Sequence, residues 1–207
     1  MKKSLKVFIS VIAVVLLMTT LAACGNSPKA ANTTPEAPLK GESKILVAYF
    51  SWSGNLQKMA GWVAEESGGE LFRILPEEAY PTNYNETADR AKNERDNGIK
   101  PALSTSIDEE TMASYDVILL GFPVWWYNLP MSVETFLTSY DFSGKTIIPF
   151  FSHEGSSNGA SSMSRLKELC PDSTVKNTSS DYLSIRGGNV ASSEKAVKDW
   201  VKGLGLE

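Results

Sequence analysis

Histidine and cysteine are scarce in this chain: its 207 residues include one histidine and two cysteines. A metal site needs several such side chains close together, and no two cysteines are neighbours here, so the sequence offers no metal-binding constellation. Charge is also modest. The formal net charge at pH 7 is −4, and removing residues 1–23, which hold three lysines and no acidic residue, leaves −7. A mildly acidic surface argues against nucleic acid as a partner.

Only one long apolar run is present, from Val7 to Leu21, and it is too short and too abruptly ended for a membrane span. It follows the basic start Met1-Lys2-Lys3 and precedes small residues, which is the pattern of an export signal. The sequence Leu21-Ala22-Ala23-Cys24 resembles the bacterial lipobox, in which the signal is cleaved before the cysteine and its thiol takes a diacylglyceryl group. The resemblance implies a lipid anchor at Cys24, on the extracytoplasmic face of the cell membrane. The alternative is an ordinary secretory signal that happens to be followed by Cys24.

Three segments follow from this pattern: a lipoprotein signal peptide at 1–23, the lipidated cysteine with a flexible tether at 24–44, and one folded domain at 45–207. The tether is rich in Asn, Ser, Thr, Pro, Ala and Lys and has no apolar periodicity, so we expect it to be disordered. Once Cys24 is acylated, Cys170 has no partner, and we expect a buried free thiol there.

Within the domain, short apolar runs alternate with segments of helical periodicity. Strands are expected at 44–50, 71–75, 115–122, 145–151 and 181–185, and helices at 56–64, 84–97, 131–139, 160–169 and 197–204. The helix at 84–97 is polar with a thin apolar stripe at Tyr84, Ala88 and Ala91, so we expect it to be exposed. This alternation predicts an α/β fold, a doubly wound, open, five-stranded parallel sheet. Ligands of such sheets bind beyond the carboxyl ends of the strands. The loops after the first, third and fourth strands are therefore the candidate site.

The loop after the first strand runs from Ser51 to Leu56, as Ser-Trp-Ser-Gly-Asn-Leu. Hydroxyl side chains, one glycine and a following helix N-terminus favour a bound anion, held by neutral donors because the loop has no Lys or Arg. The loop has neither the glycine spacing of a dinucleotide fingerprint nor the ending of a P-loop. The alternative is an ordinary capped helix start.

The loop after the third strand places Trp125, Trp126 and Tyr127 between Pro123 and Pro130. Periodicity cannot bury three consecutive aromatic side chains in one core, so at least one should border a cleft, where a flat ring can stack on it. The alternative is that these aromatic rings plug the end of the sheet.

The loop after the fourth strand, residues 152–159, is rich in serine and glycine and contains His153 and Glu154. Small residues allow close backbone approach to a ligand. A histidine beside a glutamate suggests an acid–base pair, but in a polar loop such a pair is more often solvated than catalytic.

These three loops resemble the FMN-contacting loops of flavodoxin-like proteins, in particular the bacterial branch found as flavodoxin-like lipoproteins. The resemblance covers residues 44–207 and implies the strand order 2-1-3-4-5 and FMN as cofactor. It implies that the phosphate, the flavin ring and the ribityl chain are bound by Ser51, Ser53, Gly54, Asn55, Leu56, Pro123, Val124, Trp125, Trp126, Tyr127, Ser152, His153, Glu154 and Gly155. Trp126 is the expected ring contact. The family usually has threonine where this chain has Leu56, which removes one hydroxyl donor and predicts weaker FMN binding.

The resulting hypothesis is an FMN-dependent oxidoreductase or electron carrier. Outside the cytoplasm there is no NAD(P)H pool, so a membrane quinol or another exported flavoprotein is the expected electron source. The expected partners are FMN, a redox protein or a small quinone-like acceptor, and the membrane through the anchor. One alternative is a binding module of the same fold without tight flavin binding. Another is a hydrolase that uses a serine and His153, for which no third catalytic residue can be named.

Overall fold

The structure is a computed structural model that describes residues 43–155 and 157–206. The predicted signal peptide, Cys24 and the tether up to residue 42 lie outside the described residues, so their assignment stays a prediction. Within the described part, no helix is both long and apolar enough to cross a membrane.

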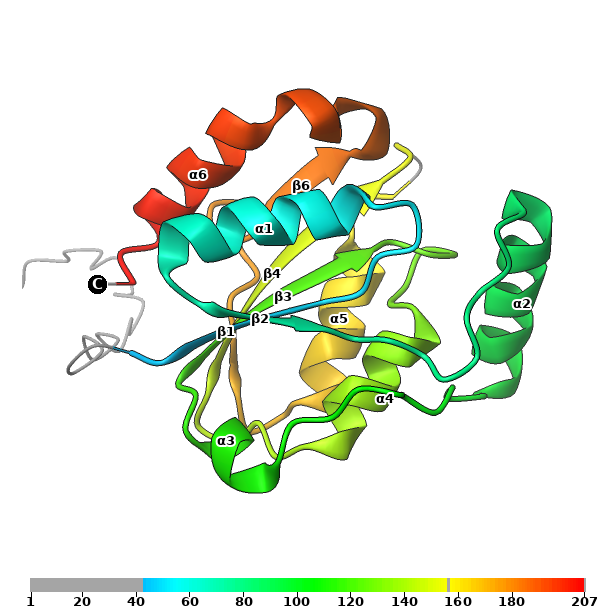
Figure 1. The fold of residues 1–207 in the computed structure, drawn as a ribbon, viewed down its shortest axis with the longest axis horizontal. Coiled ribbons are helices and arrows are strands. Elements are labelled where there is room, and N and C mark those ends of the chain that lie inside the picture. Colours follow the sequence, from blue (N-terminus) through cyan, green and yellow to red (C-terminus); the bar gives the residue numbers. More distant parts are fainter. Residues whose placement is uncertain (1–42, 156, 207) are drawn as a thin grey trace, which may run out of the picture. The chain divides into compact units, whose positions relative to one another are not determined.

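Six parallel strands form one sheet (Figure 1). Their bounds are β1 Ile45–Tyr49, β2 Glu70–Arg73, β3 Val117–Pro123, β4 Thr146–His153, β5 Thr174–Val175 and β6 Leu183–Arg186. The order β2-β1-β3-β4-β5, with every pair parallel, confirms the predicted doubly wound sheet.

The fifth position of the sheet is divided between two short strands, where the sequence predicted one strand at 181–185. β5 pairs with the start of β4 and β6 with its end. Between them the chain turns away, and the turn is closed by Asp181, whose Oδ2 accepts from the Thr178 backbone N–H at 3.0 Å and from the Thr178 hydroxyl at 2.6 Å. A side chain that caps a turn in this way competes with the strand ladder.

Helices cover both faces of the sheet (Figure 1). The bounds are α1 Asn55–Ser67, α2 Tyr84–Asn97, α3 Glu109–Ala113, α4 Met131–Ser139, α5 Ala160–Leu169, the 3₁₀ turn η1 Gly187–Ser192 and α6 Glu194–Gly203. β1 is buried on both sides because its side chains alternate. Ile45, Val47 and Tyr49 join the core under α1 and α6, while Leu46 and Ala48 join the core under α4 and α5.

Helix α2 lies off the end of the sheet (Figure 1), and polar contacts help to hold it there. The Tyr80 hydroxyl donates to Glu94 Oε2 at 2.6 Å, and Arg90 Nε donates to Glu94 Oε1 at 2.8 Å. Glu94 is 4% exposed, so this carboxylate is a buried charge with both oxygens satisfied. Burial and the hydrogen bond to Glu94 raise the pKa of Tyr80, which keeps its hydroxyl a donor. The predicted exposed helix is therefore present, but a buried ionic cluster rather than its thin apolar stripe fixes it.

Cys170 is buried at the end of α5, as the sequence predicted, and it is the one cysteine in the part of the chain that the structure describes. Burial raises the pKa of the Cys170 thiol to about 11, because the thiolate would lose its hydration.

We expect the Cys170 thiol to be unreactive in the native protein at pH 8, since the thiolate is the reactive form and the side chain is covered. Titration of the Cys24→Ala variant with Ellman's reagent, where Cys170 is the one remaining thiol, measures this directly. Fast stoichiometric labelling without denaturant would contradict the expectation, and labelling in 6 M guanidinium is the positive control.

Candidate functional site

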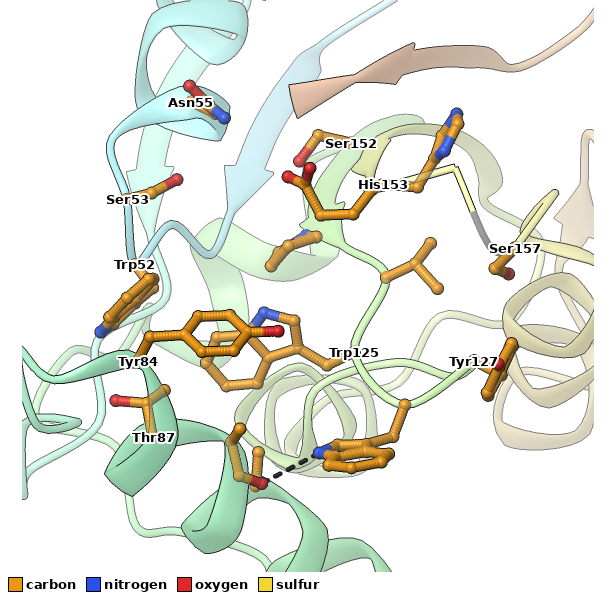
Figure 2. A pocket seen from close by; sticks show the side chains of 16 residues that line it. Trp52, Ser53, Asn55, Tyr84, Thr87, Trp125, Tyr127, Ser152, His153 and Ser157 are labelled. Carbon is orange, nitrogen blue, oxygen red and sulfur yellow. Dashed lines mark hydrogen bonds between the residues drawn. The ribbon is translucent and has the colours of Figure 1, made fainter. Parts of the chain in front are cut away.

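The three loops singled out from the sequence meet around a cavity of about 400 Å³ at the carboxyl edge of the sheet (Figure 2). Its walls are formed by Trp52, Ser53, Asn55, Tyr84, Thr87, Ala88, Ala91, Pro123, Val124, Trp125, Trp126, Tyr127, Ser152, His153, Glu154 and Ser157. Because β1, β3 and β4 are adjacent and parallel, the loops that follow them leave the sheet side by side. A cavity of this volume is within the range of small-molecule sites.

One end of the cavity is formed by the loop before α1. Gly54 has φ 90° and begins the helix without a side-chain cap, and the first turn of α1 carries no acidic residue. The first N–H groups of a helix have no acceptor within it, so they and the helix dipole favour an anion here. Ser53 and Asn55 line the cavity at this end. Ser51 is buried, and its Oγ accepts from the Gly54 N–H at 3.2 Å, so it shapes the loop.

The position of Leu56 corrects the expectation that its side chain belongs to the site. Leu56 is 1% exposed and belongs to the same core cluster as Met59 and Val63, which lie about one and two turns further along α1. Only its backbone N–H can face a ligand at the helix start. The weaker FMN binding expected from the missing hydroxyl stays a prediction.

Arg73, at the carboxyl end of β2, was not singled out from the sequence. Its Nη2 lies 3.5 Å from the Ser51 carbonyl oxygen, beside the anion-favouring loop. The strand order offered a signal, since β2 is adjacent to β1 and the two strands end at the same edge. A cation therefore lies next to a loop that contains none itself.

The aromatic loop forms one wall of the cavity, and its three aromatic residues differ in burial. Trp125 lines the cavity and also packs edge-on against Phe50 and Tyr80, with ring centroids 5.2 and 5.0 Å apart. Trp126 is 39% exposed and Tyr127 57% exposed. Both expectations for this loop hold in part, because Trp125 plugs the end of the sheet while Trp126 and Tyr127 border the cavity.

Trp126 and Tyr127 occupy a strained backbone conformation. Their φ values are 48° and 66°, and the Trp125 and Asn128 backbones exchange hydrogen bonds of 3.0 and 2.9 Å across them. A two-residue turn with both central residues left-handed normally holds Asn-Gly, because bulky side chains are disfavoured at positive φ. Such conformations cost about 1–3 kcal/mol each and persist where the surrounding structure fixes them, often at functional sites.

Helix α2 supplies the wall opposite the sheet and was missed as part of the site. Tyr84, Thr87, Ala88 and Ala91 line the cavity from this helix, and Trp52 adds a further ring. Figure 2 shows Trp52, Tyr84, Trp125 and Tyr127 around the cavity, with Ser53 and Asn55 at one end. The sequence pattern that could have indicated this role is the apolar stripe of α2, which faces the cavity rather than the core.

The loop after β4 forms the remaining side. Ser152 is 6% exposed, and its carbonyl oxygen accepts from the Val124 N–H at 2.8 Å, which joins this loop to the aromatic loop. His153 Nδ1 accepts from the Gly155 N–H at 2.9 Å, so the imidazole is held by its own loop. Glu154 is the one carboxylate among the described residues that line the cavity. Gly155 lines an adjoining open cavity with Tyr127 and His153.

The described residues of this loop do not form a hydrolase arrangement. Gly155, Ser157 and Gly159 have the spacing of a nucleophile elbow. The Ser157 hydroxyl, however, accepts from the Gly159 N–H at 3.1 Å, and His153 Nδ1 is engaged by Gly155. Neither side chain activates the other in this geometry. Among the described residues, no group of three or more His, Cys, Asp and Glu side chains could hold a metal ion.

The donor set fits FMN better than an uncharged or dinucleotide ligand. Aromatic side chains on several walls suit a planar ring, and the uncapped start of α1, with Arg73 nearby, suits a single phosphate. The predicted residues Ser53, Asn55, Pro123 to Tyr127 and Ser152 to Glu154 line one cavity, whereas the side chain of Leu56 does not.

Comparison with known proteins agrees with this geometry. Residues 44–204 match the flavodoxin family, and the chain belongs to it. The crystal structure of a candidate flavoprotein from Bacteroides uniformis ATCC 8492 is similar, with 32% identity and a TM-score of 0.65 over 78% of this chain and 99% of that one. A candidate flavoprotein from Bacteroides eggerthii DSM 20697 has 31% identity and a TM-score of 0.65, over 80% of this chain and 99% of that one.

A third similar structure is a flavoprotein from Lactobacillus acidophilus NCFM in complex with FMN. It shares 25% identity and a TM-score of 0.56, over 72% of this chain and 97% of that one. Comparison with curated protein sequences gives no match.

The strained turn leads to a prediction in which stability and ligand binding change in opposite directions. We expect Tyr127→Gly to raise the free energy of unfolding of the apoprotein by about 1 kcal/mol, because glycine adopts positive φ without steric cost. The same change should weaken FMN binding, since a ring is lost from the cavity wall. Urea denaturation and FMN titration measure the two effects.

Tyr84→Gly is the matched control, because Tyr84 also lines the cavity but begins α2 in a helical conformation. We expect this control to lower stability, as glycine does within helices. If Tyr127→Gly lowers stability as much as Tyr84→Gly does, the turn is not strained.

Proposed function

We propose that this protein is an FMN-binding redox protein, held by a lipid on Cys24 at the extracytoplasmic face of the membrane, that exchanges electrons with a protein partner. The observation that carries the proposal is the aromatic cavity closed at one end by the uncapped start of α1. It is supported by membership of the flavodoxin family and by the FMN complex of the Lactobacillus acidophilus flavoprotein.

FMN, when bound, supplies the ability to accept and release one or two electrons. The protein's own groups place it and tune it. The N–H groups at the start of α1, with Arg73 nearby, hold the phosphate, and the rings of the aromatic loop and of α2 exclude water from the flavin. Glu154 adds a negative charge on the loop after β4, which opposes further negative charge in the cavity.

Exposed aromatic side chains at the mouth of the cavity support a protein as the redox partner. The described chain enters the fold at β1, on the amino edge of the sheet, whereas the cavity lies at the carboxyl edge. A strand of five to eight residues separates the two edges by roughly 16–27 Å. The described chain therefore begins at the end of the sheet opposite the cavity. Tyr84, Trp126 and Tyr127 leave exposed aromatic surface at the mouth for a docking protein.

Ligand titration of the full-length protein in detergent tests the cofactor. We expect FMN to bind at least tenfold more tightly than riboflavin, because one charge-assisted hydrogen bond to phosphate contributes about 1.5–3 kcal/mol. FAD should bind more weakly than FMN, since the loop lacks the glycine spacing that admits a pyrophosphate. Quenching of flavin fluorescence gives the three dissociation constants. Equal affinity for FMN and riboflavin would show that the start of α1 is not the phosphate site.

Membrane fractionation tests the anchor. We expect wild-type protein expressed in a bacterium to be found with the membranes and Cys24→Ala to be found in the soluble fraction, because loss of the thiol prevents acylation. Cys170→Ala is the matched control and should remain with the membranes. Membrane association of Cys24→Ala at the wild-type level would rule out the proposed anchor.

A further inference from the structure

Three contacts from α2 converge on Trp126, one of the two strained residues. The Trp126 indole N–H donates to the Ala88 carbonyl oxygen at 2.9 Å, drawn as a dashed line in Figure 2. Arg95 Nη1 donates to the Trp126 carbonyl oxygen at 3.2 Å. The Arg95 guanidinium also lies over the indole, with Cζ 5.4 Å from the ring centroid, a cation–π distance. Arg95 thus fixes both the backbone and the ring of Trp126.

Arg95 is itself held in position by Asp96. Its Nε and Nη2 both donate to Asp96 Oδ1, at 2.9 and 2.6 Å, which leaves Nη1 for the Trp126 carbonyl. The planar guanidinium can satisfy both edges at once, whereas a lysine ammonium on a flexible stem cannot. Lys92 donates to the other Asp96 oxygen at 2.6 Å and completes the charged groups around Arg95.

The strain at Trp126 makes these contacts necessary. A bulky residue at positive φ returns to an unstrained conformation unless its surroundings hold it. The turn itself contributes only the hydrogen bonds between Trp125 and Asn128, which an unstrained turn would also make. The remaining described restraints on Trp126 all come from α2.

We propose that Arg95 is a positioning residue for the cofactor: through Trp126 it holds the indole wall in its binding conformation and couples flavin binding to the docking of α2. The proposal rests on FMN as the ligand of the cavity. The coupling is reciprocal, so a flavin that contacts the wall must in turn stabilise α2 against local opening.

Hydrogen exchange tests the positioning role without any cofactor. The Asn128 amide donates to the Trp125 carbonyl and reports whether the turn is closed. In apoprotein we expect Arg95→Ala to speed exchange of this amide about tenfold, as loss of a hydrogen bond from a charged donor implies. Arg95→Lys keeps the positive charge but lacks the planar guanidinium with its several N–H donors. We expect it to restore less than half of the protection of the Asn128 amide. Lys92→Ala, which removes the other partner of Asp96 without touching Trp126, should leave the amide unchanged.

FMN titration of the same proteins tests the coupling. We expect Arg95→Ala to weaken FMN binding about tenfold and Lys92→Ala by less than twofold. Adding FMN to wild-type protein should slow amide exchange along α2, and the effect should be smaller in Arg95→Ala.

Two results would overturn the proposal: unchanged Asn128 exchange in Arg95→Ala, or full restoration by Arg95→Lys, which would assign the effect to charge alone. Should Arg95→Ala fail to fold, the lysine variant still decides between these outcomes. Failure of wild-type protein to bind FMN would refute the proposed function, while the exchange data on apoprotein would still decide the role of Arg95.

Discussion

The parallel pairing of β1, β3 and β4 determines where every loop of the cavity lies. Each strand is buried on both faces, so its backbone must pair with its neighbours along its whole length. That pairing brings the three carboxyl ends to one edge, and the chain can leave the sheet only there. Gly121 shows how tightly this edge is built, since a Cβ at that position would lie 2.4 Å from the Phe150 ring on β4. The cavity is thus a consequence of sheet register before any of its own side chains contribute.

Helix α2 closes the cavity that begins at the edge of the sheet, and a charged cluster rather than apolar burial positions this helix. The Arg90–Glu94–Tyr80 cluster fixes the helix to the segment before it, and Tyr80 packs edge-on against Trp125. Removing one member of such a buried cluster leaves an unpaired buried charge, which is destabilising. The cluster therefore stabilises α2 only in the orientation that keeps all three side chains paired. An apolar helix of the same length would also bind the cavity wall, but with less definite orientation.

The strand order was expected from the resemblance to flavodoxin-like proteins. Sequence patterns themselves were sufficient for the parallel sheet and the meeting of three loops, because the periods of strands and helices follow from burial. They were insufficient where a side chain's direction depends on tertiary packing. Leu56 was assigned to the site because it stands where the family usually has threonine, yet the helix turns its side chain into the core. α2 was expected to be a solvated helix, since its stripe of small residues is too thin to indicate a cavity wall. Positive φ at Trp126 and Tyr127 could not be anticipated either, because aromatic residues are disfavoured in that conformation.

The charges around the cavity are separated in space, and this separation bears on the proposed redox role. Arg73 lies by the start of α1, Arg95 lies over the indole of Trp126, and Glu154 lies on the loop after β4. Gly187 helps to place Glu154, because a Cβ there would lie 2.4 Å from Glu154 Oε1. One arginine thus lies by the phosphate end of the cavity and the other by its aromatic wall, the two features that would hold the ligand. Glu154 borders the cavity without pairing to either arginine. A negative charge in this position disfavours reduction of the ligand, because reduction adds negative charge to it. The same charge has less effect on binding, because the phosphate is held at the other end of the cavity and its charge does not change on binding. Affinity and redox potential can therefore be set by different residues of the same cavity.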